Sequence, residues 1–110
     1  MAYIYHLIRP ADWEKTLQKD AYKAPSLEEE GFIHFSNKEQ VLESAHKHFP
    51  DVDQLVLLAV HEKRVKNHLK WEASRNGELF PHLYSKLRLE LIDTTFLLSR
   101  GAEGKWEWEG

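Results

Sequence analysis

Six consecutive apolar residues at positions 55–60 constrain this chain more than any other segment. The run is too short for a typical helix and too short to cross a bilayer. In an extended conformation both of its faces are apolar, so it predicts a central strand over residues 54–61 that is covered on both sides. The rest of the chain must therefore supply elements for two faces of a sheet.

The start of the chain has the pattern of a strand followed by a helix. Residues 3–8 are aromatic and β-branched, and alternation places Ile4, His6 and Ile8 on one face. A proline in the first turn, followed by acidic residues and apolar residues one turn apart, then predicts a helix over residues 10–20.

The next segment is less regular. Ser26 and Glu29 have the spacing of a capping box and predict a short helical turn within residues 22–30, which Gly31 ends. Alternating apolar residues then predict a second strand over residues 32–36.

A second capping box predicts the next helix. Ser36 and Glu39 have the required spacing, and the apolar residues that follow continue helically over 36–48. After the central strand, residues 62–65 are expected to form a helical turn and residues 69–72 a short strand.

The last third of the chain predicts strands. An Asn-Gly pair at 76–77 indicates a turn, and residues 83–98 contain one or two strands with a polar break near Asp93. The last ten residues either fray or pack as a sheet edge. This order predicts an α+β fold with a mixed, mainly antiparallel sheet and two main helices in the N-terminal half, formed by one domain over residues 1–110.

Composition excludes several functional classes. Fifteen basic and 18 acidic residues give a net charge of -3, which provides no positive surface for a nucleic-acid backbone. The absence of cysteine excludes disulfide scaffolds, thiolate zinc sites and cysteine nucleophiles, and it indicates an intracellular protein. No signal peptide or membrane span is evident, so we expect a cytoplasmic protein with no nucleic-acid or membrane partner.

Three histidines lie within or beside apolar segments, where a polar group must find a partner or cost about 1 to 3 kcal/mol. They are His6, His34 and His82. One interpretation is that backbone carbonyls or carboxylates satisfy them; the other is that they form a site. Glu78 follows the Asn-Gly turn and precedes Leu-Phe-Pro-His, which makes it either a positioned acid or an exposed turn residue.

Other polar residues carry weaker signals. Glu72 follows Trp71 in the expected short strand and is the alternative carboxylate. His46, His48 and His68 lie in polar surroundings and are interpreted as solvated surface imidazoles.

Several sequence motifs together resemble a known family. They include Tyr-His-Leu-Ile at 5–8, Glu-Gly-Phe-Ile-His-Phe-Ser at 30–36 and Gly-Glu-Leu-Phe-Pro-His-Leu-Tyr at 77–84. The chain closely resembles the bacterial and plant family called domain of unknown function 952 over residues 3 to about 98. That family in turn resembles a distant branch of the ADP-ribosyltransferases, which implies a split sheet and an NAD-binding cleft.

The resemblance implies catalytic roles. His6 takes the position that holds the nicotinamide-side ribose, and His34 stands where an aromatic residue of the nicotinamide pocket is expected. Glu78 takes the position of the acid that assists transfer, with Glu72 and Glu62 as competing carboxylates. NAD is then the expected substrate.

The expected ligand contacts surround these positions. The candidate binding residues are Tyr5, Arg9, Ser36, His82 and Glu72. The helix start at residues 36–37, with Arg9 and Lys38 nearby, is a candidate site for the ligand's pyrophosphate.

Three functional hypotheses follow. The first is an enzyme of the ADP-ribosyltransferase type that acts on NAD or a related phosphoribosyl compound. The second is a non-catalytic pocket for a nucleotide-like metabolite. The third is a metal site, since imidazole and carboxylate suit zinc or a similar ion. Its ligands would be His6, His34, His82 and Glu78.

Overall fold

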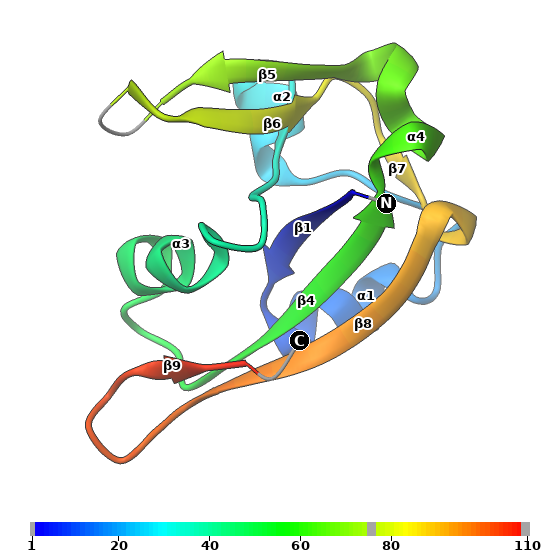
Figure 1. Ribbon diagram of the computed structural model, residues 1–110. Coiled ribbons are helices and arrows are strands. Elements are labelled where there is room, and N and C mark those ends of the chain that lie inside the picture. The colour runs from blue at the N-terminus through cyan, green and yellow to red at the C-terminus, as the bar shows by residue number, and fades with distance from the viewer. Residues whose placement is uncertain (1, 75–76, 109–110) are drawn as a thin grey trace.

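The centre of the fold is a four-stranded antiparallel sheet in the order β1-β4-β8-β9 (Figure 1). The structure is a computed structural model that describes residues 2–74 and 77–108. The predicted central strand, β4, indeed lies between β1 and β8. The strands of this sheet are β1 (Tyr3–Ile8), β4 (Gln54–His61), β8 (Ile92–Arg100) and β9 (Trp106–Glu107).

Two smaller antiparallel sheets complete the strand structure. One has the order β3-β6-β5 and the other pairs β2 with β7. Every strand pair within the described residues is antiparallel, which agrees with the expected α+β fold. The strands are β2 (Ala21–Tyr22), β3 (Ile33–His34), β5 (Leu69–Ala73), β6 (Leu79–Leu83) and β7 (Leu87–Arg88).

The helices are short. The expected N-terminal helix ends at Thr16, four residues before the predicted end at Asp20. No described helix combines the length and apolar character needed to cross a membrane. The helices are α1 (Pro10–Thr16), α2 (Pro25–Glu30), α3 (Val41–His48) and α4 (Glu62–Val65), with 3-10 turns at Lys66–His68 and Leu89–Leu91.

Both faces of β4 are buried, as its composition predicts. Leu58 and Val60 pack in one core cluster, together with residues of β1, while α1 covers that side. Leu55 and Leu57 point to the other face and pack against α3 and β9. The two main helices therefore lie on opposite sides of the sheet (Figure 1).

Residues 33–36 join the two larger sheets. Ile33 and His34 pair with β6, and the amide of Phe35 donates to the carbonyl of Pro81 at 3.0 Å. The next residue, Ser36, exchanges two backbone hydrogen bonds with Tyr5 of β1, at 2.8 and 2.7 Å. The segment thus runs between β1 and β6.

The predicted strand over 32–36 is shorter in the structure because of the proline in β6. Register places Phe35 opposite Pro81. Since proline has no N–H, only one of the two hydrogen bonds of that pair can form. Apart from Leu83, β6 lies in a stretch that was not predicted as a strand.

The first predicted capping box is wrong. Helix α2 begins at Pro25, and its N-cap residue, Ala24, has no polar side chain that could cap it. Ser26 instead donates its hydroxyl hydrogen to the carbonyl of Phe32 at 2.8 Å, which closes the turn around Gly31. That glycine has φ 91°, a conformation that favours glycine and ends the helix.

The second predicted capping box is also wrong, by one residue. The reciprocal pair consists of Asn37 and Gln40, whose side-chain oxygens accept from each other's backbone amides at 2.9 and 3.0 Å. Ser36 cannot take the cap position because its backbone is paired with Tyr5. Helix α3 therefore begins only at Val41.

The C-terminal strands differ from the prediction in extent. Within the predicted strand region of residues 83–98, β7 is followed after Arg88 by a 3-10 turn, and Asp93 lies within β8 rather than at a break. Of the predicted Asn-Gly turn, Gly77 has φ 78°, as a turn requires. Asn76 lies outside the described residues.

The C-terminal tryptophans pack as a sheet edge, one of the two expected outcomes. Trp106 is buried in β9 with the Arg100 guanidinium 4.5 Å from its ring centre. Trp108 packs edge-on against Tyr5 with ring centres 5.1 Å apart.

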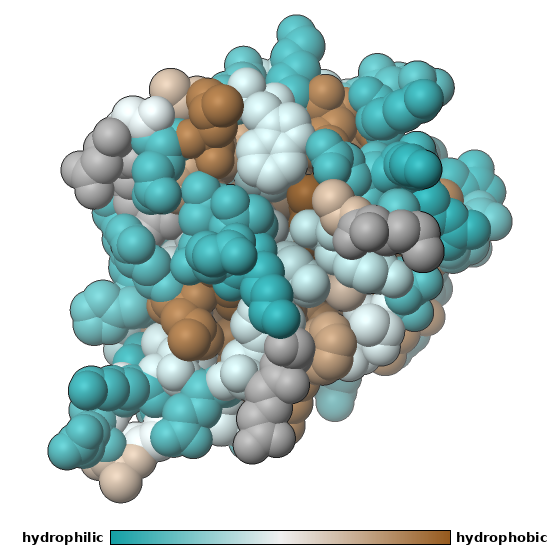
Figure 2. Space-filling view, viewed as in Figure 1, coloured by the Kyte–Doolittle hydropathy of each residue, from teal (hydrophilic) through white to brown (hydrophobic). Residues whose placement is uncertain are grey.

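On the face shown in Figure 2, polar side chains cover most of the surface and apolar ones lie between them in separate places.

Replacing Leu58 by alanine should lower the free energy of unfolding by about 2 to 5 kcal/mol, because the side chain is fully buried in β4 and its loss leaves a cavity. The same change at Leu97, which is 58% exposed on the neighbouring strand β8, should cost less than about 0.5 kcal/mol. Urea denaturation of both variants measures the difference. Equal losses would contradict the assignment of β4 as the central strand.

Candidate functional site

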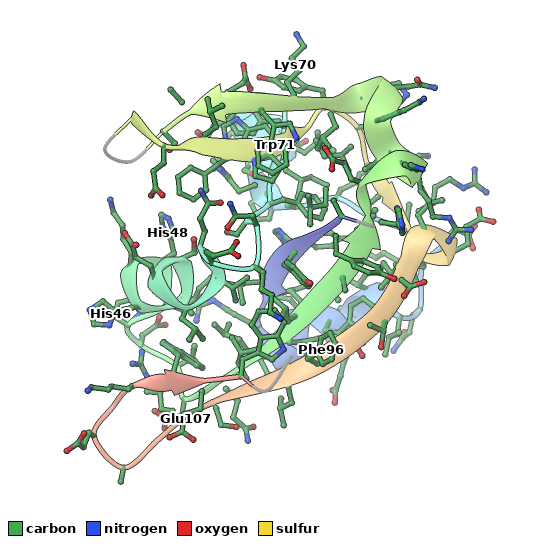
Figure 3. All side chains as sticks on the ribbon, in the orientation of Figure 1. His46, His48, Lys70, Trp71, Phe96 and Glu107 are labelled. Carbon is green, nitrogen blue, oxygen red and sulfur yellow. The ribbon has the colours of Figure 1, made fainter. Side chains whose placement is uncertain are left out.

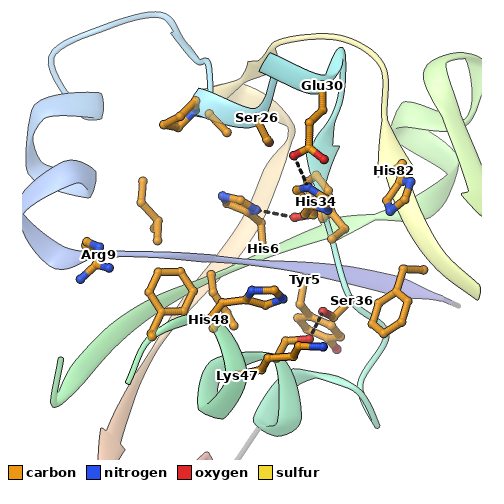
Figure 4. A pocket seen from close by; sticks show the side chains of 18 of the residues that line it. Tyr5, His6, Arg9, Ser26, Glu30, His34, Ser36, Lys47, His48 and His82 are labelled. Carbon is orange, nitrogen blue, oxygen red and sulfur yellow. Dashed lines mark hydrogen bonds and ion pairs between the residues drawn. The ribbon is translucent and has the colours of Figure 1, made fainter. Parts of the chain in front are cut away.

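One cavity of about 620 Å³ lies beside β1, between α2, α3 and β6 (Figure 4). It collects most of the residues that sequence analysis proposed, although they come from distant parts of the chain. The carboxylates Glu72 and Glu78 are not among its lining residues. The predicted residues that line it are Tyr5, His6, Arg9, His34, Ser36 and His82.

His6 is buried and both of its ring nitrogens have partners. Nδ1 lies 2.6 Å from the carbonyl of His34, which can only accept, so Nδ1 carries the hydrogen. Nε2 then accepts from the Tyr22 hydroxyl at 2.8 Å. Burial lowers the pKa of His6 to about 4, which keeps the ring neutral near pH 7. His6 therefore connects β1 to the backbone of β3 and to Tyr22 of β2.

His34 pairs with a carboxylate that sequence analysis missed. Its Nε2 lies 2.9 Å from Oε2 of Glu30, and both side chains are about half exposed. Glu30 ends α2, and the turn at Gly31 brings it back toward His34. The sequence signal that could have identified Glu30 is its position four residues before His34, with Gly31 between the two. Glu30 also lines the cavity.

His82 is held by a carboxylate behind it. Its Nδ1 lies 2.9 Å from Oε1 of Glu72, and the Tyr84 hydroxyl donates to the same oxygen at 2.5 Å. The hydrogen bonds from Tyr84 and His82 lower the pKa of the Glu72 carboxyl below its usual value. Glu72 is thus connected to the cavity through His82.

The expectation that Glu78 meets the histidines is wrong. Glu78 is exposed immediately before β6. Its backbone carbonyl accepts a hydrogen bond from the amide of Ser74 at 2.8 Å, which closes the β5–β6 hairpin. The competing residue Glu62 accepts from Trp71 Nε1 at 3.0 Å and does not line the cavity. Glu62 in α4 and Glu78 next to β6 therefore both lie outside the cavity lining.

The predicted anion site at residues 36–37 is also wrong. The amide of Ser36 donates to Tyr5, and the amide of Asn37 donates to the Gln40 side chain. These N–H groups are already used within the protein. The hydroxyl of Ser36 lies 3.0 Å from that of Ser44, and both residues line the cavity.

Basic side chains line another part of the cavity. Arg9 forms a bidentate pair with Asp51 at 2.9 and 3.2 Å. The Arg9 guanidinium lowers the pKa of the Asp51 carboxyl. Lys47 and His48 of α3 also line the cavity, so the interpretation of His48 as a surface residue alone is incomplete. Figure 3 shows His48 and His46 on different sides of α3.

The hypothesis of a metal site gains no support. Among residues 2–74 and 77–108, no group of three or more histidine, cysteine or acidic side chains is placed to hold a metal ion. Two of the proposed ligands, His6 and His82, have Nδ1 engaged by other groups, and Glu78 lies outside the cavity.

Comparison with known proteins identifies the family. The protein-family model described as "Protein of unknown function (DUF952)" matches residues 7–95. The chain belongs to the DUF952 family. A search of curated proteins found no significant match.

Solved structures share the fold of this DUF952 chain. A crystal structure of protein CC0527 from Caulobacter crescentus is 36% identical, with a TM-score of 0.87 over 96% of this chain and 93% of that chain. The solution NMR structure of CC0527 is 37% identical, with a TM-score of 0.83 over 96% of this chain and 91% of that chain. The comparisons show a shared family and fold, and the resemblance to ADP-ribosyltransferases stays a prediction.

The buried position of His6 predicts that its imidazole is protonated only at a pH well below 6.5. Between about pH 4 and 6.5 the unfolded chain binds a proton at this residue that the folded chain excludes, so the free energy of unfolding should rise with pH over that range. NMR titration of the ring should give a midpoint near 4, while the exposed His46 serves as a control in the same spectra. A midpoint near 6.5 for His6 would contradict the assignment.

Proposed function

We propose that the cavity binds a nucleotide-like metabolite of the NAD and ADP-ribose class. The observation that carries the proposal is a single cavity of about 620 Å³ with basic side chains in one part and imidazole and aromatic rings in another. That volume lies within the range of small-molecule sites, and such a lining suits a ligand that joins phosphate to a planar ring.

The basic part of the cavity suits phosphate. Arg9 has five N–H donors and uses one on each of its two terminal nitrogens for Asp51. Lys47 and His48 add donors from the neighbouring helix. Figure 4 shows Arg9 and His82 on opposite sides of the cavity, which leaves room for an elongated ligand between them.

The other part suits a ribose and a planar base. His34 stands edge-on to His82 with ring centres 5.3 Å apart, and Phe80 also lines the cavity. Planar rings of this kind stack on bases and on nicotinamide. The hydroxyls of Ser36 and Ser44 lie in the same wall and can bond to ligand hydroxyls.

A second candidate function is transfer of the ADP-ribosyl group, and the position of Glu30 favours it. Cleavage of the nicotinamide glycosidic bond builds positive charge on the ribose, which a nearby carboxylate stabilises. Glu30 is a carboxylate on the cavity wall, oriented by His34 at 2.9 Å. It would take the role that the family resemblance implied for Glu78.

The binding proposal predicts that ADP-ribose and NAD raise the melting temperature and give a binding heat in calorimetry. Lys47→Gln should weaken the affinity about tenfold, since it removes one charge-assisted hydrogen bond. Lys63→Gln on α4 is the matched control, because Lys63 is exposed and does not line the cavity. Absence of any binding by the wild-type protein at millimolar ligand would refute the proposal.

The transfer candidate predicts release of nicotinamide from NAD by the wild-type protein and a loss of about 100-fold or more in Glu30→Gln, with NAD affinity changed much less. Chromatographic measurement of nicotinamide gives the rates, and calorimetry gives the affinities. If NAD binds to both proteins and neither forms product, the site binds without turnover.

A further inference from the structure

Of the two ring nitrogens of His82, one has a hydrogen-bond partner and the other has none within residues 2–74 and 77–108. Nδ1 lies 2.9 Å from Glu72, whereas Nε2 is buried and has no hydrogen-bond partner among the described residues. The side chain is only 7% exposed. Buried polar atoms in folded proteins are nearly always satisfied, so an orphaned one requires an explanation.

The bonds around Glu72 determine which nitrogen carries the hydrogen. An ionised carboxylate only accepts hydrogen bonds, and Tyr84 already donates to the oxygen that faces His82. Nδ1 of His82 must therefore donate. In the neutral ring Nε2 then carries a lone pair and is an acceptor.

The ring is also fixed in orientation. Phe32 stacks on one face with ring centres 4.0 Å apart and an angle of 18° between the planes. The strand pairing of β5 with β6 holds Glu72 opposite Phe80, two positions from His82. A histidine whose Nδ1–H is held by a carboxylate has its tautomer and direction set in advance.

The direction of Nε2 follows from that of Nδ1. The two nitrogens lie on different edges of the imidazole ring, so an Nδ1 turned to Glu72 directs Nε2 away from it. His82 lines the cavity and Glu72 does not. Leaving a buried acceptor unsatisfied is unfavourable, and a donor from the ligand would remove that cost.

We propose that Nε2 of His82, oriented by Glu72 and Tyr84, is a hydrogen-bond acceptor for an O–H or N–H group of the bound ligand. For a ligand of the NAD and ADP-ribose class these donors are ribose hydroxyls and the carboxamide. The identity of the ligand rests on the proposed function, whereas the acceptor state of His82 does not. Glu72 is a positioning residue here because it acts through His82.

Imidazole nitrogen NMR on the full chain tests the proposal. Long-range proton–nitrogen correlation near pH 8 should show His82 with hydrogen on Nδ1 and none on Nε2. Glu72→Gln should change the tautomer ratio by about tenfold or more toward Nε2–H, because the amide can donate to Nδ1. The control is Glu62→Gln, which alters a carboxylate that also accepts from a ring N–H, that of Trp71, but does not contact His82.

The outcomes are distinguishable. An Nε2–H tautomer in the wild-type protein would overturn the inference, and that spectrum decides it even if a variant fails to fold. An unchanged ratio in Glu72→Gln would overturn the positioning role.

ADP-ribose and NAD are then added as probes. A probe that binds should shift Nε2 of His82 and leave that of His6, which already has Tyr22 as its donor, nearly unchanged. Binding that leaves Nε2 of His82 unmoved would overturn the contact with the ligand. Failure of both probes to bind would refute the proposed function, while the spectra of the free protein would still decide the acceptor state.

Discussion

The hydrogen bond from His6 to the carbonyl of His34 is the interaction on which the cavity depends. It joins a side chain of β1 to the backbone that pairs with β6, and the Tyr5–Ser36 backbone pair lies beside it. The bond is partly buried and His6 itself is buried, so loss of the imidazole would leave the His34 carbonyl without this partner. Tyr22 satisfies the second nitrogen of the ring. Both nitrogens of His6 are therefore hydrogen-bonded, whereas the side chains of His34 and Glu30 are about half exposed.

The cavity combines a neutral structural histidine with two histidines that are paired to carboxylates. Burial explains the difference, because it disfavours charge on His6, which has a carbonyl and a phenol as partners. His34 and His82 each have a glutamate 2.9 Å away. Each pair fixes the direction of an imidazole or a carboxylate, and the transfer candidate uses the carboxylate of Glu30 that His34 orients.

Sequence patterns predicted the histidines better than the carboxylates. A histidine among apolar strand residues is conspicuous, and strand alternation correctly gave His6 a buried position. The partners of a carboxylate depend instead on how hairpins and turns fold back. Glu78 follows a turn and precedes an apolar segment, yet it is exposed, whereas Glu72 reaches His82 across two paired strands. Glu30 becomes part of the site only through the left-handed turn that follows it.

The sequence by itself determined the α+β class, the central strand at residues 54–61 and the segregation of His6 with apolar neighbours, because hydrophobic periodicity is a local property of the chain. Tertiary structure decided the shift of the capping box from Ser36 to Asn37, the short β3 and the members of the cavity. Each of these outcomes depends on a contact between distant segments: Ser36 is held by Tyr5, and the β3 ladder stops at Pro81. No local pattern contains those pairings, since they form only when the two sheets meet around residues 33–36.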